Sequence, residues 1–549
     1  MNMKKILLIT MLFSLAVASC KKELDVRNPN SPTVQSAATE SGVISLAQGG
    51  VYINGFKTLK YGDGIFGQFW SGAIGFHSMM GDEIGAEAAN GYINQIGCPD
   101  YVVLDDGSKV VNPNAPAKQH DMLRAINLNG NQGQNPMFYE WAYMYELNNV
   151  CNNILQIAAK ATYTGDAAAK LATLQAWAYW WKGFAYAHIG SMYYAGLIVN
   201  TPGITNGGYV TKEAIINESN ANLDKAASLL SKITNADAYT AVLGKLIPDF
   251  CQVGNGGVLT PAEWIENINT FKARNILVNT PVASMTNAQW TSILTLTNSG
   301  IKLGDHVFTG RSNATGDFLD PTSGTISAKT TASAAGGNTY KLSERFVQDF
   351  KAGDKRLANV LQTKVWIGNA DRGNSFNTRY TLVDAGTAAN FPAGVIQFSN
   401  RNVGGYELFL AGSYDENELM KAEAKLYLSD IAGALASIDN VRSSQGAGLA
   451  AIAGTTSDPA VVKEELRKER RIGLAFRGLA FYDARRWGVI NDITAGGGRT
   501  KTIIVDNNAK VNTNASINYN FLAYWDVPDN DLAYNQPVAG SAPVNNPKP

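Results

Sequence analysis

Residues 463–488 have the sequence KEELRKERRIGLAFRGLAFYDARRWG. Wound as one helix, this stretch places six residues on one stripe, at the spacing of a buried amphipathic face: Leu466, Gly473, Phe476, Ala480, Ala484 and Trp487. Glu469 lies on the same stripe, and no cation stands three or four positions away from it. Because an unpaired carboxylate on a buried face costs roughly several kcal/mol, we expect its partner to come from another part of the fold.

The same stretch contains two glycines within the expected helix. Gly473 and Gly478 each cost about 1 kcal/mol relative to alanine in a helix, and close approach of another backbone is the usual compensation. The stretch is therefore predicted to be a centre of packing. A structural role is favoured over a catalytic one, since networks of ion pairs are commonly structural.

The composition excludes a strongly charged partner. The 549 residues carry 46 basic and 46 acidic side chains, and charged residues make up only 17% of the chain, so no net field favours nucleic acid. The 10 Trp and 23 Tyr residues are enough for a large core and for exposed aromatic platforms. No long charged or Pro-rich linker divides the chain, so residues 41–549 are predicted to form a single unit.

The N-terminus has the pattern of an export signal. Lys4 and Lys5 precede the apolar run ILLITMLFSLAVA, which is shorter than the roughly 20 residues that span a bilayer. Cys20 stands directly after Val17-Ala18-Ser19 and looks like the lipidation site of a bacterial lipoprotein; an ordinary signal peptide that contains a cysteine is the alternative. Residues 1–19 are predicted to be a signal peptide, and residues 20–40 a lipidated, polar tether.

Apart from Cys20 there are three cysteines, Cys98, Cys151 and Cys251. Their odd number and wide spacing argue against a disulfide framework and against a zinc site, although one disulfide between two of them stays possible. Cys151 lies on an apolar helical stripe and is predicted to be a small buried hydrophobe.

Several segments have helical periodicity. They are residues 137–160, residues 167 to about 190, residues 212–233, and residues 415–446 with a break near Asp430. Aromatic and small residues alternate along them, as in helical repeats of the tetratricopeptide type, although the repeat period is not clean. The sequence therefore predicts a mainly α-helical fold of paired helices.

The stretch from about residue 305 to 406 is rich in Gly, Ser, Thr and Asn, which predicts a loop-rich insert, and a shorter one runs from Tyr61 to Val110. Long ordered loops on a helical scaffold commonly carry binding sites. Sugar binding requires flat aromatic rings and fixed polar groups. The loops offer Tyr92, Tyr101, Phe318, Trp366, Arg372, Phe376, Asn377, Arg379 and Tyr380. Packing within the loops is the alternative for each, and Trp366 and Tyr380 are the strongest candidates because no apolar periodicity includes them.

Three other patterns do not support chemistry. Residues 62–67 match G-x-G-x-x-G, but no β-strand and βαβ unit surround them, so a dinucleotide site is rejected. His77, His120, His188 and His306 lack metal-ligand spacing, and His188 is predicted to be a core residue. Asp82-Glu83 and Asp105-Asp106 are predicted to be solvated loop acids, because glycoside hydrolysis needs two carboxylates across a cleft. No catalytic residue, metal or cofactor is predicted.

The residues above also carry a family resemblance: the chain resembles the SusD/RagB family of outer-membrane lipoproteins of Bacteroidetes. The C-terminal signature of that family is matched by Glu469-Arg470-Arg471, Phe476-Arg477-Gly478, Tyr482-Asp483 and Arg485-Arg486-Trp487-Gly488. Further matches are Leu24-Asp25-Val26 with Asn28-Pro29, Trp141, Tyr145, Asn152, Leu342 to Phe350 with Asp354 and Arg356, Glu423-Ala424, Asn440-Val441-Arg442, and Trp525-Asp526-Val527-Pro528. The chain departs from the family pattern at Lys182-Gly183, Asn148 and Asn535-Gln536-Pro537.

The resemblance implies about four tetratricopeptide-like helix pairs that support a loop-rich ligand face, and an Arg-rich core in which Glu469 and Asp483 pair with arginines. It also implies a lipid anchor in the outer membrane and a TonB-dependent transporter of the SusC type as partner. The expected function is that of a non-enzymatic glycan-binding protein for nutrient uptake. A peptide ligand, as in RagB, is the first alternative, and a surface glycosidase is a less favoured one.

Overall fold

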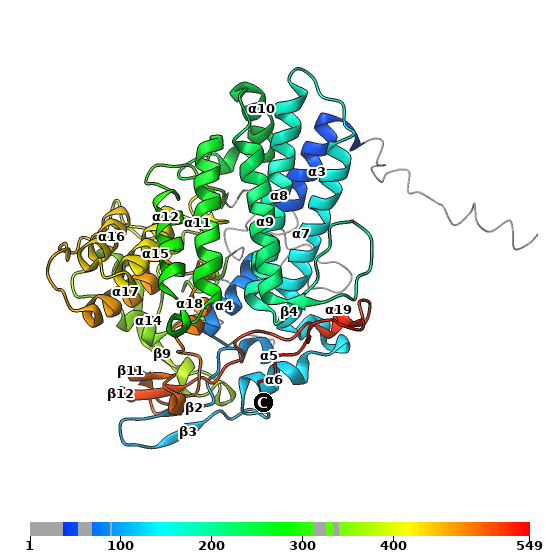
Figure 1. Ribbon diagram of the computed structural model, residues 1–549. Coiled ribbons are helices and arrows are strands. Elements are labelled where there is room, and N and C mark those ends of the chain that lie inside the picture. The colour runs from blue at the N-terminus through cyan, green and yellow to red at the C-terminus, as the bar shows by residue number, and fades with distance from the viewer. Residues whose placement is uncertain are drawn as a thin grey trace, which may run out of the picture.

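The computed structural model describes residues 37–52, 69–87, 91–311, 313, 325–332 and 340–548. Helices dominate this part of the chain (Figure 1). Their bounds are α3 Glu40–Tyr52, α4 Ile74–Met80, α5 Gly91–Asn94, α6 Gln119–Ile126, α7 Pro136–Ala158, α8 Ala167–Met192, α9 Lys212–Leu230, α10 Ala236–Leu246, α11 Pro261–Asn279, α12 Asn287–Asn298, α13 Ile326–Lys329, α14 Glu344–Gln348, α15 Tyr414–Tyr427, α16 Ile431–Ser444, α17 Pro459–Gly473, α18 Ala480–Arg486 and α19 Asp529–Leu532.

The strands are short and form small antiparallel sheets. Their bounds are β1 Ile84–Ala86, β2 Tyr101–Val103, β3 Lys109–Val111, β4 Ala195–Gly196, β5 Val210–Thr211, β6 Thr309–Arg311, β7 Tyr340–Leu342, β8 Val360–Trp366, β9 Thr378–Leu382, β10 Glu407–Phe409, β11 Arg499–Val505 and β12 Val511–Asn518. β11, β12, β2 and β3 form the largest sheet, in that order, and the pairs β1–β7, β10–β6, β4–β5 and β8–β9 form the others.

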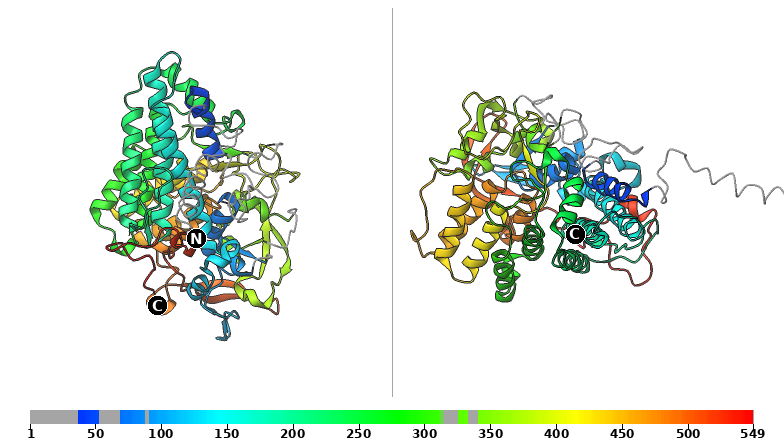
Figure 2. Two further views of the ribbon diagram at one scale, coloured as in Figure 1. Left: turned by 90° about the vertical axis from the view of Figure 1, so that its right-hand side faces the viewer. Right: turned by 90° about the horizontal axis from the view of Figure 1, so that it is seen from above.

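The long helices α7, α8, α9, α11 and α12 stand side by side (Figure 1). α15, α16 and α17 pack together next to α12. In the turned views the long helices gather on one side of the molecule, and most of residues 340–410, in yellow-green, lie on the other (Figure 2). The predicted mainly helical architecture of paired, tetratricopeptide-like helices is confirmed, as is the break near Asp430, which caps α16.

The core is built around α8, which is apolar on all sides as a central helix must be. Trp177, Trp180 and Trp181 on α8 are fully buried and meet Trp264 of α11 and Phe308 edge-on or tilted. Such pairs contribute about 0.5–1.5 kcal/mol each beyond the area they bury. This aromatic cluster fixes α8 against α11 and the segment that enters β6.

Close packing of α9 against α8 explains the glycine of Lys182-Gly183, one of the departures from the family pattern. A Cβ atom on Gly183 would lie 2.7 Å from the Leu223 side chain of α9, and a Cβ on Gly190 would lie 2.9 Å from Ile216 of the same helix. Both glycines therefore let α9 approach the backbone of α8 closely. Lys182, beside the first of them, is buried and donates to the amide oxygens of Asn152 and Asn200.

The stretch from Lys463 to Gly488 is not one helix, and that expectation is wrong. α17 ends at Gly473 and α18 begins at Ala480, because Phe476 has a φ of 60° and Gly478 a φ of 72°, which are left-handed values that end a helix. The side chain of Ile74 lies only 2.9 Å from where a Cβ on Gly478 would stand. Gly478 thus allows both the left-handed turn between α17 and α18 and the close approach of the Ile74 side chain.

The expected partners of Glu469 come from elsewhere in the fold, as predicted. Arg356 donates to both carboxylate oxygens of Glu469, and Arg442 of α16 donates to Oε2 at 2.8 Å. Asp483 likewise accepts hydrogen bonds from Arg470 at 2.9 Å and from Arg486 at 2.8 Å. These side chains are almost completely buried, so the predicted arginine–carboxylate network holds α16, α17 and α18 together.

Asp82 and Glu83 join this network, which corrects the prediction that they are solvated acids. Asp82 is 6% exposed and Glu83 1% exposed. The Asp82 carboxylate accepts from Arg345 at 2.7 Å and from the Tyr519 hydroxyl at 2.8 Å. Both acids follow directly after α4, whose end packs against α18. Asp105 and Asp106, in contrast, are exposed as expected.

The loop-rich insert is also more ordered than the sequence indicated, because strands β6 to β9 and helices α13 and α14 lie within residues 305–406. Cys98, Cys151 and Cys251 are all buried, as predicted for Cys151. Within the ranges that the structure describes, no helix has both the length and the hydropathy needed to cross a bilayer. Residues 1–36, with Cys20, and the glycine-rich stretch 62–67 lie outside those ranges.

Replacing Gly478 with alanine is expected to destabilise the protein by more than replacing Gly454. Both glycines have positive φ, so a Cβ at either position should lower the free energy of unfolding by about 1–2 kcal/mol through backbone strain. At Gly478 the added Cβ would also meet the Ile74 side chain, whereas nothing lies within 4 Å of a Cβ at Gly454. Urea unfolding of Gly478→Ala and Gly454→Ala measures the difference. Equal midpoints would show that Ile74 moves away without cost.

Replacing Glu469 with glutamine is expected to destabilise the protein by about 3 kcal/mol, because Arg356 and Arg442 then lose the buried carboxylate that they share and keep only Asp354 and Glu465, respectively. Glu464→Gln is the matched control on the same helix. Its side chain is 52% exposed and pairs with Arg467, so the loss should stay below about 1 kcal/mol. Thermal unfolding of both variants provides the measurement, and similar losses would contradict the assigned role of Glu469.

Candidate ligand-binding site

Four of the predicted ligand residues lie on one antiparallel ribbon made of β8, β9 and the turn between them. Trp366 ends β8 and pairs with Thr378, while Tyr380 pairs with Gln362 on the neighbouring strand. Phe376 lies in the short 3-10 turn that leads into β9, and Arg379 follows on that strand. The fold therefore brings Trp366, Phe376, Arg379 and Tyr380 together.

Two of these four side chains are engaged within the protein. Phe376 is only 4% exposed, and its ring lies 2.3 Å from where a Cβ on Gly85 would stand. The prediction that Phe376 contacts a ligand is therefore corrected: its ring packs against β1. The Arg379 guanidinium donates two hydrogen bonds, of 3.1 and 2.8 Å, to the carboxylate of Glu344. Asn377, which is buried, donates to the carbonyl of Val505. Arg379 and Asn377 thus fix the ribbon to α14 and β11.

Trp366 and Tyr380 keep part of their rings exposed. The Lys341 ammonium lies 5.6 Å from the centroid of the Trp366 ring, and the Arg379 guanidinium lies 5.3 Å from that of Tyr380. Tyr380 also packs against the main core. Trp366 is therefore the more open of the two platforms, and a ligand on it stays a prediction.

Tyr92 and Tyr101 lie on other elements. Tyr92 is on α5 and is 45% exposed. Tyr101 is on β2, where the Lys109 ammonium covers its ring at 3.7 Å from the centroid. Phe318 and the side chain of Arg372 lie outside the described residues. The six predicted residues are thus distributed over a ribbon, a short helix and a sheet.

A cleft that the sequence did not predict lies between α12, β10 and the α17–α18 break. This outer cleft has a volume of about 380 Å³. Its walls come from the loop 301–307, from residues 394–398 and 405–415, from the end of α16 and from residues 473–477. Three partly exposed aromatic rings face it, those of Tyr406, Phe409 and Tyr414. The only sequence signal was the pair Gly404-Gly405 before Tyr406, at the end of the loop-rich stretch.

Exposed apolar side chains surround the outer cleft. Leu303 lines it and is 70% exposed. Val253 and Val403, which are 51% and 56% exposed, lie in two loops that Arg311 connects, since its guanidinium donates to the carbonyls of Val253 and Gly404. Large apolar side chains that gather at a cleft commonly mark a binding surface.

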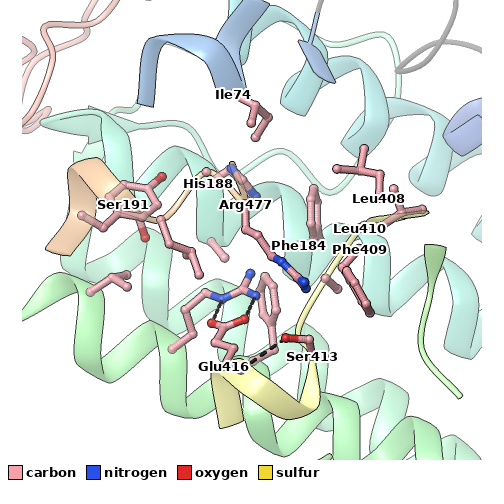
Figure 3. A pocket seen from close by; sticks show the side chains of 18 of the residues that line it. Ile74, Phe184, His188, Ser191, Leu408, Phe409, Leu410, Ser413, Glu416 and Arg477 are labelled. Atoms are coloured by element: carbon pink, nitrogen blue, oxygen red, sulfur yellow. Dashed lines mark hydrogen bonds and ion pairs between the residues drawn. The ribbon is translucent and has the colours of Figure 1, made fainter. Parts of the chain in front are cut away.

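A smaller inner pocket of about 40 Å³ adjoins the outer cleft, and the two share Phe409, Ser413 and Arg477 (Figure 3). α8 contributes Phe184 and His188 to the inner pocket, and α11 contributes Arg274. Arg274 forks onto the carboxylate of Glu416 with two hydrogen bonds of 2.5 Å. The pocket is therefore polar on one side and aromatic on the other.

His188 is a core residue, as predicted, and belongs to a buried pair of histidines. Its Nδ1 lies 2.5 Å from Glu140, and Nε2 of His77 lies 2.9 Å from the same carboxylate. Burial alone would raise the pKa of Glu140, but the two histidines outweigh it and lower that pKa to about 2. Burial lowers the pKa of His188 itself. The three side chains link α4, α7 and α8 behind the inner pocket.

Arg477 stands where the inner pocket meets the outer cleft. Its guanidinium stacks on Phe409, 3.9 Å from the ring centroid. In Figure 3 its side chain reaches into the pocket between Phe184 and Phe409. The arginine that hydrogen-bonds to Glu416 is Arg274. Arg477 owes this position to the α17–α18 break, because the left-handed turn at Phe476 and Gly478 points it away from the buried network.

Residues 416–547 match the family model described as the SusD family. This part of the chain therefore has the sequence pattern of the SusD family, as the sequence resemblance predicted. Among solved structures, a SusD-like carbohydrate-binding protein from Bacteroides fragilis has a TM-score of 0.55 and 14% identity, with 91% of this chain and 98% of that one covered. A SusD-like carbohydrate-binding protein from Bacteroides vulgatus has a TM-score of 0.51 and 14% identity, with coverages of 92% and 98%.

A third similar structure contains a xylogluco-oligosaccharide; its TM-score is 0.54 and its identity 12%, with 92% of this chain and 100% of that chain covered. At such low identities the similarity shows a shared fold, which extends over almost the whole length of these structures. No curated protein sequence matches the chain significantly.

The acid Glu83 gives the region behind the cleft a pH dependence. One of its oxygens accepts from the backbone N–H of Phe476, and burial raises its pKa from 4.5 to about 7. The folded chain therefore holds a proton that the unfolded chain releases. The stability that this group contributes is complete below pH 4.5 and is lost as the pH rises to about 7.

Glu83→Gln is accordingly expected to flatten the decline of the unfolding free energy between pH 4.5 and about 7. Urea unfolding at several pH values in this window measures the slope. Glu464→Gln serves as control, because the bond from Arg467 outweighs burial and lowers the pKa of Glu464, so it titrates below the window. An unchanged slope in Glu83→Gln would contradict the raised pKa.

Proposed function

We propose that this protein is a non-catalytic, glycan-binding lipoprotein of the outer membrane that captures oligosaccharides at the cell surface and passes them to a TonB-dependent transporter of the SusC type. Two structures with the same fold are described as carbohydrate-binding proteins, and a third contains an oligosaccharide. The match of residues 416–547 to the model of the SusD family supports the same class of ligand.

The outer cleft is the observation that carries the proposal. Sugar rings have apolar faces that stack on aromatic side chains, and hydroxyl groups that need fixed hydrogen-bonding partners. The cleft supplies both: Tyr406, Phe409 and Tyr414 provide rings, and polar side chains stand between them, namely Asn255, Gln397, Ser413 and Ser444. Its volume of about 380 Å³ is within the range of small-molecule sites.

The acids of the cleft are poorly placed for glycoside hydrolysis, which needs one free carboxylic acid and one free carboxylate. Glu407 pairs with Arg311 at 2.9 Å and accepts from Asn255 at 2.8 Å. Asp415 accepts from the Ser444 hydroxyl with one oxygen and from the Gln445 amide with the other. Both acids are thus held by the protein, which favours binding over catalysis.

The anchor and the partner complete the proposal. The sequence pattern predicts a lipid on Cys20, which precedes the first described helix. Such a lipid would tether the folded part of the chain to the membrane surface. The exposed apolar side chains around the cleft, Leu303, Val253 and Val403, support contact with a further surface. A transporter that receives the ligand is the partner this arrangement suits.

Tyr414→Ala is expected to weaken oligosaccharide binding by roughly 3- to 10-fold, the contribution of one aromatic contact. Isothermal titration calorimetry of the purified full chain against a panel of plant and bacterial oligosaccharides, with a peptide digest alongside, measures the change. Tyr534→Ala is the control, because Tyr534 is 77% exposed and lies next to α19, away from the cleft.

Trp366→Ala, measured in the same way, separates the outer cleft from the ribbon. A loss of binding in Trp366→Ala with none in Tyr414→Ala would move the site to the ribbon. Binding to peptides alone would replace the proposed function with peptide uptake, and the appearance of shortened oligosaccharides would replace it with hydrolysis.

A further inference from the structure

Arg477 differs from most of the buried arginines that the structure describes. Arg485 also has no carboxylate partner, but its guanidinium donates to three backbone carbonyls. Arg471 binds Asp349 at 2.7 Å, and Arg486 forks onto Glu423 with two bonds of 2.6 Å. Arg477 has no such partner among the described residues: the nearest carboxylate, that of Asp415, is 4.0 Å from its Nη2. Its Nη1 is buried and makes no hydrogen bond within that part of the chain.

The neighbouring acids are engaged with other partners. Asp415 accepts hydrogen bonds of 2.7 Å from Ser444 and 2.9 Å from Gln445. Glu416 is gripped by Arg274, and Glu407 by Arg311. Arg477 therefore has Asp415 at the limit of ion-pair distance and makes no hydrogen bond to a carboxylate among the described residues, although its side chain is only 12% exposed. A buried guanidinium in this state is poised to take an external anion.

The guanidinium is also fixed in direction. It lies against the ring of Phe409 at 3.9 Å, and it lines both the inner pocket and the outer cleft. An anionic group of a ligand in the outer cleft would meet the open edge of the guanidinium without moving it. Preorganisation of this kind reduces the entropy that binding loses.

We propose that Arg477 binds the carboxylate of an acidic saccharide, so that the outer cleft takes oligosaccharides that contain uronic acid. This inference rests on the proposed glycan-binding function and names the class of glycan. The carboxylate of a uronic acid is planar and singly charged, which matches the fork of one arginine. The ring that carries it would lie against the tyrosines of the cleft.

Other occupants of the position fit less well. The inner pocket, at about 40 Å³, has room for a few water molecules, and water would satisfy Nη1 but would not neutralise the charge. A doubly charged phosphate or sulfate would face Asp305, Glu407 and Asp415, which all line the outer cleft. A single carboxylate on an otherwise neutral sugar encounters the least repulsion.

Calorimetry on the purified full chain tests the proposal with matched ligands. The probes are oligomers of galacturonic, mannuronic and glucuronic acid, each compared with its carboxyl-reduced counterpart, in which a CH2OH group replaces the carboxylate. At least one acidic oligomer is expected to bind roughly 10- to 100-fold more tightly than its reduced form, and added salt should narrow the gap. Equal affinity within every pair would overturn the proposal.

Two substitutions locate the effect. Arg477→Gln should remove the preference for the acidic oligomer and leave the affinity for the reduced one nearly unchanged, and Arg477→Lys should keep part of the preference because the charge remains. Lys468→Gln is the matched control, since it removes one positive charge from a partly exposed lysine on α17. A preference that survives Arg477→Gln, or that Lys468→Gln reduces as much, would also overturn the proposal.

The experiments distinguish a failure of the Arg477 proposal from a failure of the proposed glycan-binding function. If neutral oligosaccharides bind in the cleft and Tyr414→Ala weakens them while no acidic preference exists, glycan capture stands and the assignment of Arg477 fails. If no saccharide of either kind binds, both fail.

Discussion

The pairing of Glu469 with Arg356 and Arg442 is the interaction on which the C-terminal half depends. These three side chains come from three segments, and each is nearly inaccessible to water. In such surroundings a charge without its partner is far more costly than an apolar side chain, so the three segments can come together in only one arrangement. Arg470 of α17 and Arg486 of α18 extend the same constraint to Asp483 and Glu423.

The network also explains where the candidate site lies. α17 is held by its buried charges up to Gly473, and α18 is held from Ala480 onward, so the residues between them must turn. The turn leaves Arg477 of the signature outside the network and facing the two pockets. A structural core and a binding surface are thus produced by neighbouring residues of one motif. What differs is whether a carboxylate of the protein meets the guanidinium.

The fold was largely predictable from the sequence, and the site was not. The helical periodicity of residues 137–160 and 212–233 gave α7 and α9 because one face of each must be buried. The unpaired position of Glu469 correctly indicated a distant partner. The break between α17 and α18 was missed because Phe476 fits a helical stripe, and its positive φ results from contacts that periodicity does not encode. The outer cleft was missed for a similar reason: Tyr414, Arg477 and Leu303 are brought together only by tertiary packing. Phe376 was misjudged because a glycine on another strand, Gly85, makes room for its ring.

The sheet β11-β12-β2-β3 has a consequence for the order of events during biogenesis. Its middle strands come from opposite ends of the chain: the backbone N–H of Thr513, within β12, donates to Asp105, which follows β2, across a separation of 408 residues. The edge of β2 in the β2–β3 hairpin therefore has no strand to pair with until almost the whole polypeptide, including β12, has been synthesised. Closure of so long a loop is slow, and an unpaired edge invites aggregation in the meantime. The chain should accordingly depend on a holding chaperone, and a truncation before β12 should leave a species that is degraded rather than a shorter functional protein.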